Sequence, residues 1–238
     1  MKKSKRKVIA KDTLDILEKG FYHNQAGEKV LLSKVQKEAE NKTVLYQPER
    51  LLELIGKPSK TKTEFQTEFV VDNLSTLDSV RNQFQYDKNL VCLNFASARN
   101  PGGGFLKGSQ AQEESIARAT GLYKCQLKAE DYYKYNRAIK TCLYTDYIIY
   151  SPKVPILKNE EGELLDQLVY AGMITAPAVN TGVILRNEPQ NIDKIVPMMK
   201  RRIEMVLAIC KEQGHKTLIL GAWGCGVFGN DPKVIALL

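Results

Sequence analysis

Two adjacent glutamates behind a run of glycines form the sequence pattern with the clearest potential for chemistry. The run consists of Gly102, Gly103 and Gly104, and seven residues later it is followed by Gln112, Glu113 and Glu114. Consecutive glycines have no Cβ, so their backbone can adopt positive φ angles and approach a ligand closely. A carboxylate held beside such a loop is well placed for general acid–base catalysis.

Each part of this pattern also has a structural interpretation. The glycines could form a tight turn between a strand and a helix. Ser109 and Gln112 have the spacing of a helix capping box, and acidic residues in a first helical turn gain from the helix dipole. The residues alone therefore leave catalysis and helix capping both open.

A second glycine-rich loop covers residues 221–230. Gly224, Gly226 and Gly229 have the spacing G-x-G-x-x-G, but only nine residues follow Gly229. We therefore do not expect the second strand and ribose-binding acid of a dinucleotide-binding fold. Consecutive backbone N–H groups before a helix still make a favourable anion site, and a diphosphate suits it. Phe228 could stack on a ligand or pack in the core.

Hydrophobic patterning predicts strands that alternate with helices, which is typical of an α/β fold with a mixed or parallel sheet. Expected strands cover residues 68–73, 90–96, 147–150, 168–176 and 217–222. Expected helices cover residues 7–19, 49–55, 75–84 with Ser75 as N-cap, 112–126, 130–139 and 191–213, and one more opens at Asp231-Pro232. In such sheets ligands bind at the carboxyl ends of strands, where both glycine loops are expected.

Composition excludes several classes of protein. The 238 residues are 43% hydrophobic and 26% charged, which is too apolar for a disordered chain. No run of 18 apolar residues is present, and charges at Lys11, Asp12 and Asp15 interrupt any secretory signal, so we expect neither a membrane span nor a signal peptide. Five scattered cysteines and two histidines argue against a zinc site or a Ser–His triad, and they suit a reducing cytoplasm.

The net charge is +8, from 35 Lys and Arg against 27 Asp and Glu. This excess favours an anionic partner such as a nucleotide, a nucleic acid or another phosphate-rich molecule. Five of the first seven residues are Lys or Arg, and the simplest interpretation of that segment is a solvated N-terminus.

Taken together, the two loops resemble the signature of poly(ADP-ribose) glycohydrolases. The segment from Gly102 to Glu114 is similar to the family's GGG-x(6–8)-QEE pattern, and the segment ending in GAWGCGVFGNDP resembles the phosphate loop of the microbial-type branch. The resemblance covers essentially the whole chain. It implies a macrodomain-like, three-layer α/β/α fold with a mixed central sheet, composed of an N-terminal helical extension (1–62) and a catalytic domain (63–238). The family continues past the GNDP turn with a full helix and a further strand, whereas this chain ends at Leu238, which leaves open whether the catalytic domain is truncated.

The resemblance also implies roles for individual residues. Glu114 is the expected catalytic acid and base, while Glu113 and Asn100 are expected to hold the ribose that is released. The three glycines of the first loop and Gln112 are expected to bind substrate. In the second loop the residues expected to hold the diphosphate are Gly224, Cys225, Gly226, Val227 and Phe228, the last of which would also stack on the ligand. The implied reaction is hydrolysis of the ribose–ribose O-glycosidic bond, which needs no metal and no cofactor.

The expected substrate is poly(ADP-ribose) or ADP-ribosylated protein, the product is ADP-ribose, and the enzyme is expected to be a monomer. One alternative is a macrodomain that binds ADP-ribose without hydrolysing it; another is a hydrolase for ADP-ribose on protein or DNA. A nucleic-acid-binding module would explain the charge, with Tyr132, Tyr133 and Tyr135 as stacking residues. That tyrosine cluster has a simpler interpretation as one face of an amphipathic helix.

Overall fold

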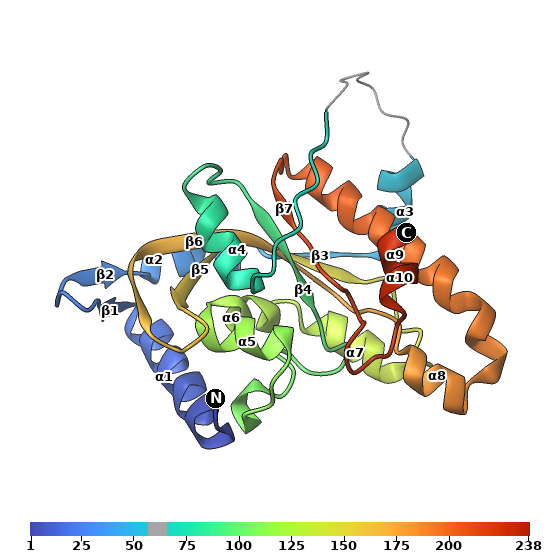
Figure 1. Ribbon diagram of the computed structural model, residues 1–238, viewed down its shortest axis with the longest axis horizontal. Coiled ribbons are helices and arrows are strands. Elements are labelled where there is room, and N and C mark those ends of the chain that lie inside the picture. Colours follow the sequence, from blue (N-terminus) through green and yellow to red (C-terminus); the bar gives the residue numbers. More distant parts are fainter. Residues whose placement is uncertain (57–65) are drawn as a thin grey trace.

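The computed structural model describes residues 1–56 and 66–238 and contains one mixed sheet between two layers of helices (Figure 1). The elements are α1 (Lys3–Lys19), β1 (Phe21–His23), β2 (Lys29–Leu31), α2 (Ser33–Asn41), β3 (Val44–Tyr46), α3 (Pro48–Gly56), α4 (Thr76–Phe84), β4 (Val91–Phe95), η1 (Phe105–Lys107), α5 (Gln112–Ala119), α6 (Leu122–Leu127), α7 (Glu130–Ala138), β5 (Ile148–Lys158), β6 (Leu164–Ala176), α8 (Thr181–Asn187), η2 (Pro189–Lys194), α9 (Ile195–Glu212), β7 (Leu218–Ile219) and α10 (Pro232–Leu237).

The main sheet has five strands in the order β3-β5-β6-β4-β7. The strands β6, β4 and β7 are parallel, whereas β3 and β6 both pair with β5 in antiparallel orientation. The predicted mixed α/β sheet is therefore confirmed. Parallel pairing brings the carboxyl ends of β6, β4 and β7 to one edge of the sheet, because parallel strands run in the same direction.

Side chains of the central strands alternate between two cores, as the period-two geometry of a strand requires. On β4, Val91 and Leu93 pack with α3, α8 and α9, whereas Cys92 packs with α2, α4, α5 and α6. On β6, Ile174 faces the first of these cores and Met173 faces the second. Burial on both faces explains why these strands are nearly continuous runs of apolar residues, and it gives the predicted three layers.

The N-terminal region departs from the expected helical extension. It holds α1, α2 and α3, but it also contains a β1–β2 hairpin, and β3 pairs with β5 as a strand of the main sheet. Strands of three residues are too short to show a clear two-residue period in the sequence. The predicted boundary between residues 62 and 63 lies outside the described residues.

Four predicted elements also differ from the structure. Residues 68–73 form no strand, and their apolar side chains are exposed, with Phe69 at 89% and Val71 at 96%. The helix predicted over 112–126 is two helices, because the Gly121 N–H donates to the Pro155 carbonyl of β5 at 2.9 Å. The helix expected to start at residue 191 begins as the 3-10 turn η2. The last strand is only two residues long and not buried, since β7 lies at the edge of the described sheet.

One buried arginine fixes α9 to the loop before β5 and to the end of β6. Arg202 is fully buried and donates to the Leu143, Tyr144 and Pro177 carbonyls at 2.6, 2.9 and 3.1 Å and to Asp146 Oδ1 at 2.9 Å. Its neighbour Arg201 also contacts Asp146, but the Arg201 side chain is 41% exposed. The two arginines therefore share one carboxylate in different environments.

We expect Arg202→Met to lower the free energy of unfolding by roughly 3–5 kcal/mol, because it leaves three carbonyls and the largely enclosed Asp146 carboxylate without this buried donor. The matched control Arg201→Met should cost about 1 kcal/mol or less, since exposed ion pairs contribute little. Urea denaturation measures both. Equal losses of stability in the two variants would contradict this account of Arg202.

Candidate functional site

Both glycine-rich loops leave the same edge of the sheet. The first begins after β4, the second begins after β7, and these two strands are parallel neighbours. Neighbouring strands lie about 4.8 Å apart, so the two loops start side by side. This juxtaposition, which was expected from the sequence, is confirmed by the strand order.

The carboxyl group of Glu113 is buried at the start of α5 and joins three segments. Its Oε1 accepts hydrogen bonds from Asn94 Nδ2 on β4 at 3.2 Å and from Gln126 Nε2 on α6 at 3.0 Å. Its Oε2 accepts from the Ser97 backbone N–H at 2.6 Å. The residue is only 3% exposed, so the carboxyl group fixes the position of α5 against the end of β4.

Burial raises the pKa of Glu113 to about 8, because the ionised carboxylate loses its hydration inside the protein. The three hydrogen bonds oppose this shift, and the charge of Glu114 adds to it. Asn94 Oδ1 is buried without a partner. If the Asn94 amide group rotates, Asn94 Oδ1 can accept a hydrogen bond from the protonated carboxyl group of Glu113.

Glu114 lies beside the glycine run and is partly exposed. Its Oε1 accepts a hydrogen bond from the Gly104 N–H at 2.9 Å. Gly103 has φ of +58°, and a Cβ there would stand 2.5 Å from Glu114 Oε1 and 3.1 Å from Glu113 Oε2. Both carboxyl groups therefore border Gly103, and glycine is required there by the backbone angle as well as by space.

Gln112 lies against the sheet, whereas Asn100 lies at the surface. The Gln112 side chain lies along β4: its Oε1 accepts from the Phe95 N–H at 2.8 Å, and its Nε2 donates to the Leu93 carbonyl at 2.7 Å. Ser109 does not cap α5, whose N-cap is Ala111 without a side-chain cap, so the interpretation of Ser109 and Gln112 as a capping box is wrong. Asn100 is exposed just before the glycine run.

The second loop is held in shape by Asn230. Asn230 Nδ2 donates to the Val179 and Gly224 carbonyls at 2.8 and 3.1 Å, and Asn230 Oδ1 accepts from Thr181 Oγ1 at 2.8 Å. Gly224 has φ of +75°, and a Cβ there would lie 2.5 Å from Asn230 Nδ2. The loop is thus fastened to the end of β6 and the start of α8.

The tip of this loop is open. Val227 is 90% exposed, and a Cβ on Gly226 would meet no atom within 4 Å. Within the described part of the chain, the backbone N–H groups of residues 226–228 donate no hydrogen bond. Phe228 is half-buried and lies 6.1 Å from the Tyr144 ring, measured between centroids. The three N–H groups of residues 226–228, here called the amide cradle, are therefore free to bind an anion.

Three polar residues of the site were missed by sequence reasoning: the buried Asn94 and Gln126 and the partly exposed Ser97. Asn94 interrupts a buried apolar strand, and that was the available signal, because a buried polar group needs a partner. Gln126 is fully buried; its Nε2 donates to Glu113 and its Oε1 accepts from the Gly102 N–H at 2.8 Å. No local pattern indicates this link, since Gln126 lies 24 residues from Gly102.

Two of the three tyrosines in the α7 cluster belong to the core. Tyr132 and Tyr133 are buried, and Tyr135 stacks on Tyr147. The interpretation as an amphipathic helix face is confirmed, so these two buried rings offer no stacking surface to a nucleic acid. Among the residues that the structure describes, no three His, Cys, Asp or Glu side chains are grouped as a metal site would need. No described helix combines the length and apolar character needed to cross a membrane.

Residues 10–159 match the family described as microbial-type PARG, catalytic domain. The chain belongs to this family. This chain is also similar to solved structures of poly(ADP-ribose) glycohydrolases (PARGs). Poly(ADP-ribose) glycohydrolase from Thermomonospora curvata superposes with a TM-score of 0.94 at 37% identity, over 98% of this chain and 85% of that chain. Its structure bound to the inhibitor ADP-HPD gives a TM-score of 0.91 at 37% identity, over 98% and 84% of the two chains.

Poly(ADP-ribose) glycohydrolase from Deinococcus radiodurans in complex with ADP-ribose gives a TM-score of 0.81 at 40% identity, over 84% of this chain and 81% of that chain. Comparison with curated proteins gives no match. The recognised resemblance to the PARG family is therefore confirmed.

The raised pKa of Glu113 predicts a pH-dependent stability that Glu113→Gln removes. The unfolded chain loses this proton near pH 4.5 and the folded chain near pH 8, so the folded state binds more protons between these values. Stability should therefore fall as pH rises through this window and then level off. Relative to Glu113→Gln, the wild type should lose roughly 3–5 kcal/mol between pH 4.5 and 8.5. Urea denaturation across this range measures the difference, and parallel curves would contradict the prediction.

Proposed function

We propose that this chain hydrolyses the ribose–ribose O-glycosidic bond of poly(ADP-ribose) and releases ADP-ribose. The observation that carries the proposal is the placement of Glu114: a partly exposed carboxylate, held by the Gly104 N–H, at the sheet edge from which the amide cradle also extends. A carboxylate and an anion site at one edge suit a substrate that has a glycosidic bond near a diphosphate. The relatives with bound ADP-HPD and ADP-ribose support the same ligand class.

In the proposed reaction Glu114 acts first as an acid and then as a base. Protonated Glu114 donates to the leaving 2′-oxygen while an oxocarbenium ion develops at the anomeric carbon. The resulting carboxylate then removes a proton from the water that captures this ion. The hydrogen bond from the Gly104 N–H fixes the orientation of the Glu114 carboxyl group.

Glu113 and Gln112 act differently from Glu114 in this proposal. Glu113 Oε2 borders Gly103, so it can also accept a hydrogen bond from a ribose hydroxyl while three protein donors hold its carboxyl group. Gln112 is a positioning residue, since its amide group is bonded to the backbone of β4. The exposed Asn100 side chain is free to bind the same ribose as Glu113.

The diphosphate of ADP-ribose would bind to the amide cradle, with Phe228 stacking on the ligand. Three backbone N–H groups without partners among the described residues suit an anion of this size, and the partly exposed Phe228 ring is accessible beside them. The positive charge of the chain, +8, favours association with a polyanion.

A macrodomain relationship, a monomeric state and a cytoplasmic location remain predictions. The mixed sheet between two helical layers supports the first. Five cysteines without disulfide bonds suit a reducing compartment and so support the third.

Glu114→Gln should lower the rate of ADP-ribose release from automodified polymer by about 10²–10⁴-fold. The glutamine amide can still accept the Gly104 hydrogen bond, but it can neither donate a carboxylic proton nor activate water. Affinity for ADP-ribose should stay within about threefold of wild type. Glu113→Gln should lose less activity, since that residue only orients the ribose. Wild-type turnover in Glu114→Gln would refute its role, and an inactive wild-type protein that binds ADP-ribose would indicate a binding module instead.

Gly226→Val should abolish ADP-ribose binding, for which calorimetry on the wild type should give a single site of micromolar affinity, roughly −8 kcal/mol. The added side chain would occupy the open space at the amide cradle, and it meets no protein atom at its Cβ, so the fold should be kept. Thermal unfolding provides the control. Unchanged affinity in a variant that melts like the wild type would exclude the cradle as the diphosphate site.

A further inference from the structure

The basic N-terminal segment packs against the turn that follows the glycine run and is not a free tail. It forms the first two turns of α1, and Arg6 Nε donates to the Gly108 carbonyl at 2.7 Å. A Cβ on Gly108 would lie 2.7 Å from the Lys3 carbonyl and 3.1 Å from Lys7 Cγ. The chain of α1 therefore contacts the turn that follows the glycine run.

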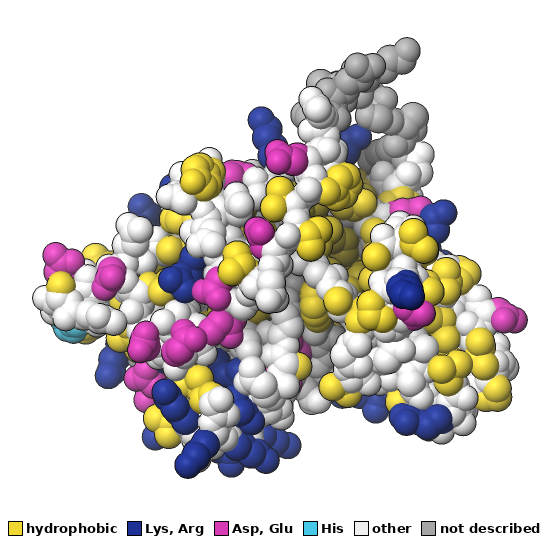
Figure 2. Space-filling model, viewed as in Figure 1, with side chains coloured by type: hydrophobic (Ala, Val, Ile, Leu, Met, Phe, Trp, Pro, Cys, Tyr) yellow, Lys and Arg dark blue, Asp and Glu magenta, His cyan; other side chains and the backbone are white. Residues whose placement is uncertain are grey.

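This docking gathers positive charge beside the site. The exposed side chains of Lys2, Lys3, Lys5, Lys7 and Lys107, here called the basic surface, come from α1 and η1. Figure 2 shows Lys and Arg side chains grouped at the end of the molecule where Figure 1 places the N-terminus. None of these five lysines forms an ion pair with another described residue. The basic surface is therefore open to an external anion.

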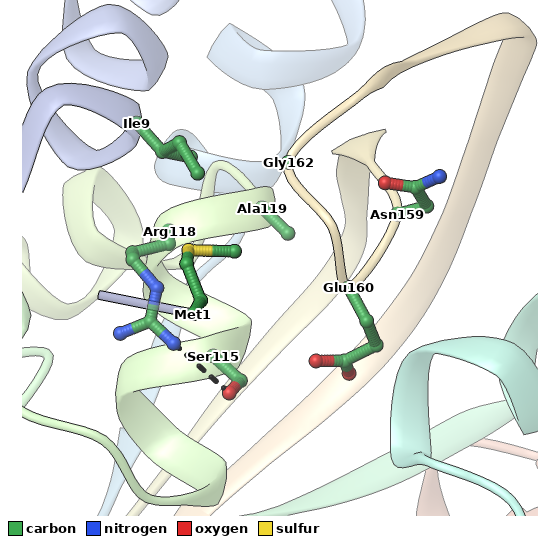
Figure 3. A pocket seen from close by; sticks show the side chains of 8 residues that line it. All are labelled: Met1, Ile9, Ser115, Arg118, Ala119, Asn159, Glu160 and Gly162. Carbon is green, nitrogen blue, oxygen red and sulfur yellow. Dashed lines mark hydrogen bonds between the residues drawn. The ribbon is translucent and has the colours of Figure 1, made fainter. Parts of the chain in front are cut away.

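Two acidic residues on or near α1, Asp12 and Glu160, form no ion pair with the basic surface. Asp12 on α1 pairs with the buried Lys158 at 2.6 Å. Glu160 lines a cavity of about 10 Å³ with Met1 and Arg118 (Figure 3), which has room for about one water molecule. That cavity is too small for a phosphate-bearing ligand, so it does not compete with the exposed basic surface for a large anion.

We propose that the basic surface binds the diphosphates of polymer units next to the unit held in the site. The inference rests on the proposed function, and it names the extended polymer, not a single ADP-ribosyl group, as the preferred ligand. Lys107 follows Gly104 by three residues of a 3-10 turn, roughly 6 Å, and Gly104 donates to Glu114. That separation is within the Debye length of about 8 Å at physiological salt, so Lys107 acts on phosphates close to the reacting bond, and the lysines of α1 extend the basic surface away from it.

A polymer chain carries several phosphates that can bind several lysines at once. Each exposed contact between a lysine and a phosphate is weak, but binding several phosphates of one chain releases several condensed counterions. The result is a strong salt dependence for long polymer and none of comparable size for free ADP-ribose. Chain length and salt therefore distinguish this surface from the amide cradle.

The test is a triple variant, Lys3→Gln, Lys7→Gln and Lys107→Gln, in the full chain. On long polymer at low salt we expect KM to rise about 5- to 20-fold with kcat unchanged. The slope of log(kcat/KM) against log salt concentration should become shallower by about 2, if each lost lysine accounts for roughly 0.7 as on single-stranded nucleic acid. Affinity for ADP-ribose should not change.

The matched control replaces three exposed lysines elsewhere, Lys34→Gln, Lys37→Gln and Lys216→Gln, and has the same net charge as the test variant. Lys216 precedes β7 and so lies at the sheet edge opposite the site. The control should keep the wild-type KM and salt slope. Equal effects in the two triple variants would overturn the proposal, because they would show that net charge alone matters.

Polymer binding by both triple variants in a Glu114→Gln background separates this proposal from the proposed function. Weaker polymer binding in the basic-surface variant than in the control supports the proposal even if the wild type releases no ADP-ribose. Equal polymer binding refutes it even if the wild type is active. Failure of the proposed function itself appears as absent ADP-ribose release by the wild type.

Discussion

The buried carboxyl group of Glu113 is the constraint on which the site depends. It accepts hydrogen bonds from β4, from the segment directly after β4 and from α6, so it joins the end of β4 to a helix that lies later in the chain. Burying an ionisable group costs free energy unless hydrogen bonds offset it, and the raised pKa of Glu113 reflects that cost. The same hydrogen bonds fix the start of α5, where the next residue is Glu114.

From that fixed point the two glutamates, although adjacent in sequence, acquire different environments. Glu113 is enclosed, whereas Glu114 reaches the glycine run and stays partly exposed. Two carboxyl groups in different surroundings can perform different tasks, one orienting and one transferring protons. Gln126 extends the same arrangement, since its amide group binds both Glu113 and the Gly102 N–H. The glycine run and α5 are thus held together through a residue of α6.

Local patterns predicted the parts of the fold that local physics determines. Ser75 caps α4, Asp231 caps α10, and β4 and the two loops lie where apolar runs and glycines indicated. The errors occurred where long-range pairing decides the structure. The prolines at 152 and 155 argue against a strand in the sequence, yet β5 continues to Lys158. Pro152 lies in the bulge between Ser151 and Val154, and Pro155 follows the bulge and pairs with Tyr170 of β6. Gln112 resembled a helix cap but bonds to β4. Asn94 stood out only as a polar residue in an apolar strand, and Gln126 gave no signal of its contact with Glu113.

The central claim is that one sheet edge combines the Glu114 carboxylate and the amide cradle into a single ADP-ribose site. A crystal structure of this protein with ADP-ribose bound tests it most directly. The account predicts diphosphate oxygens within about 3 Å of the backbone nitrogens of residues 226–228, and the anomeric carbon of the released ribose on the Gly103 side, facing Glu114. A ligand bound away from either loop, or bound with its diphosphate at the basic surface instead of the cradle, would contradict it.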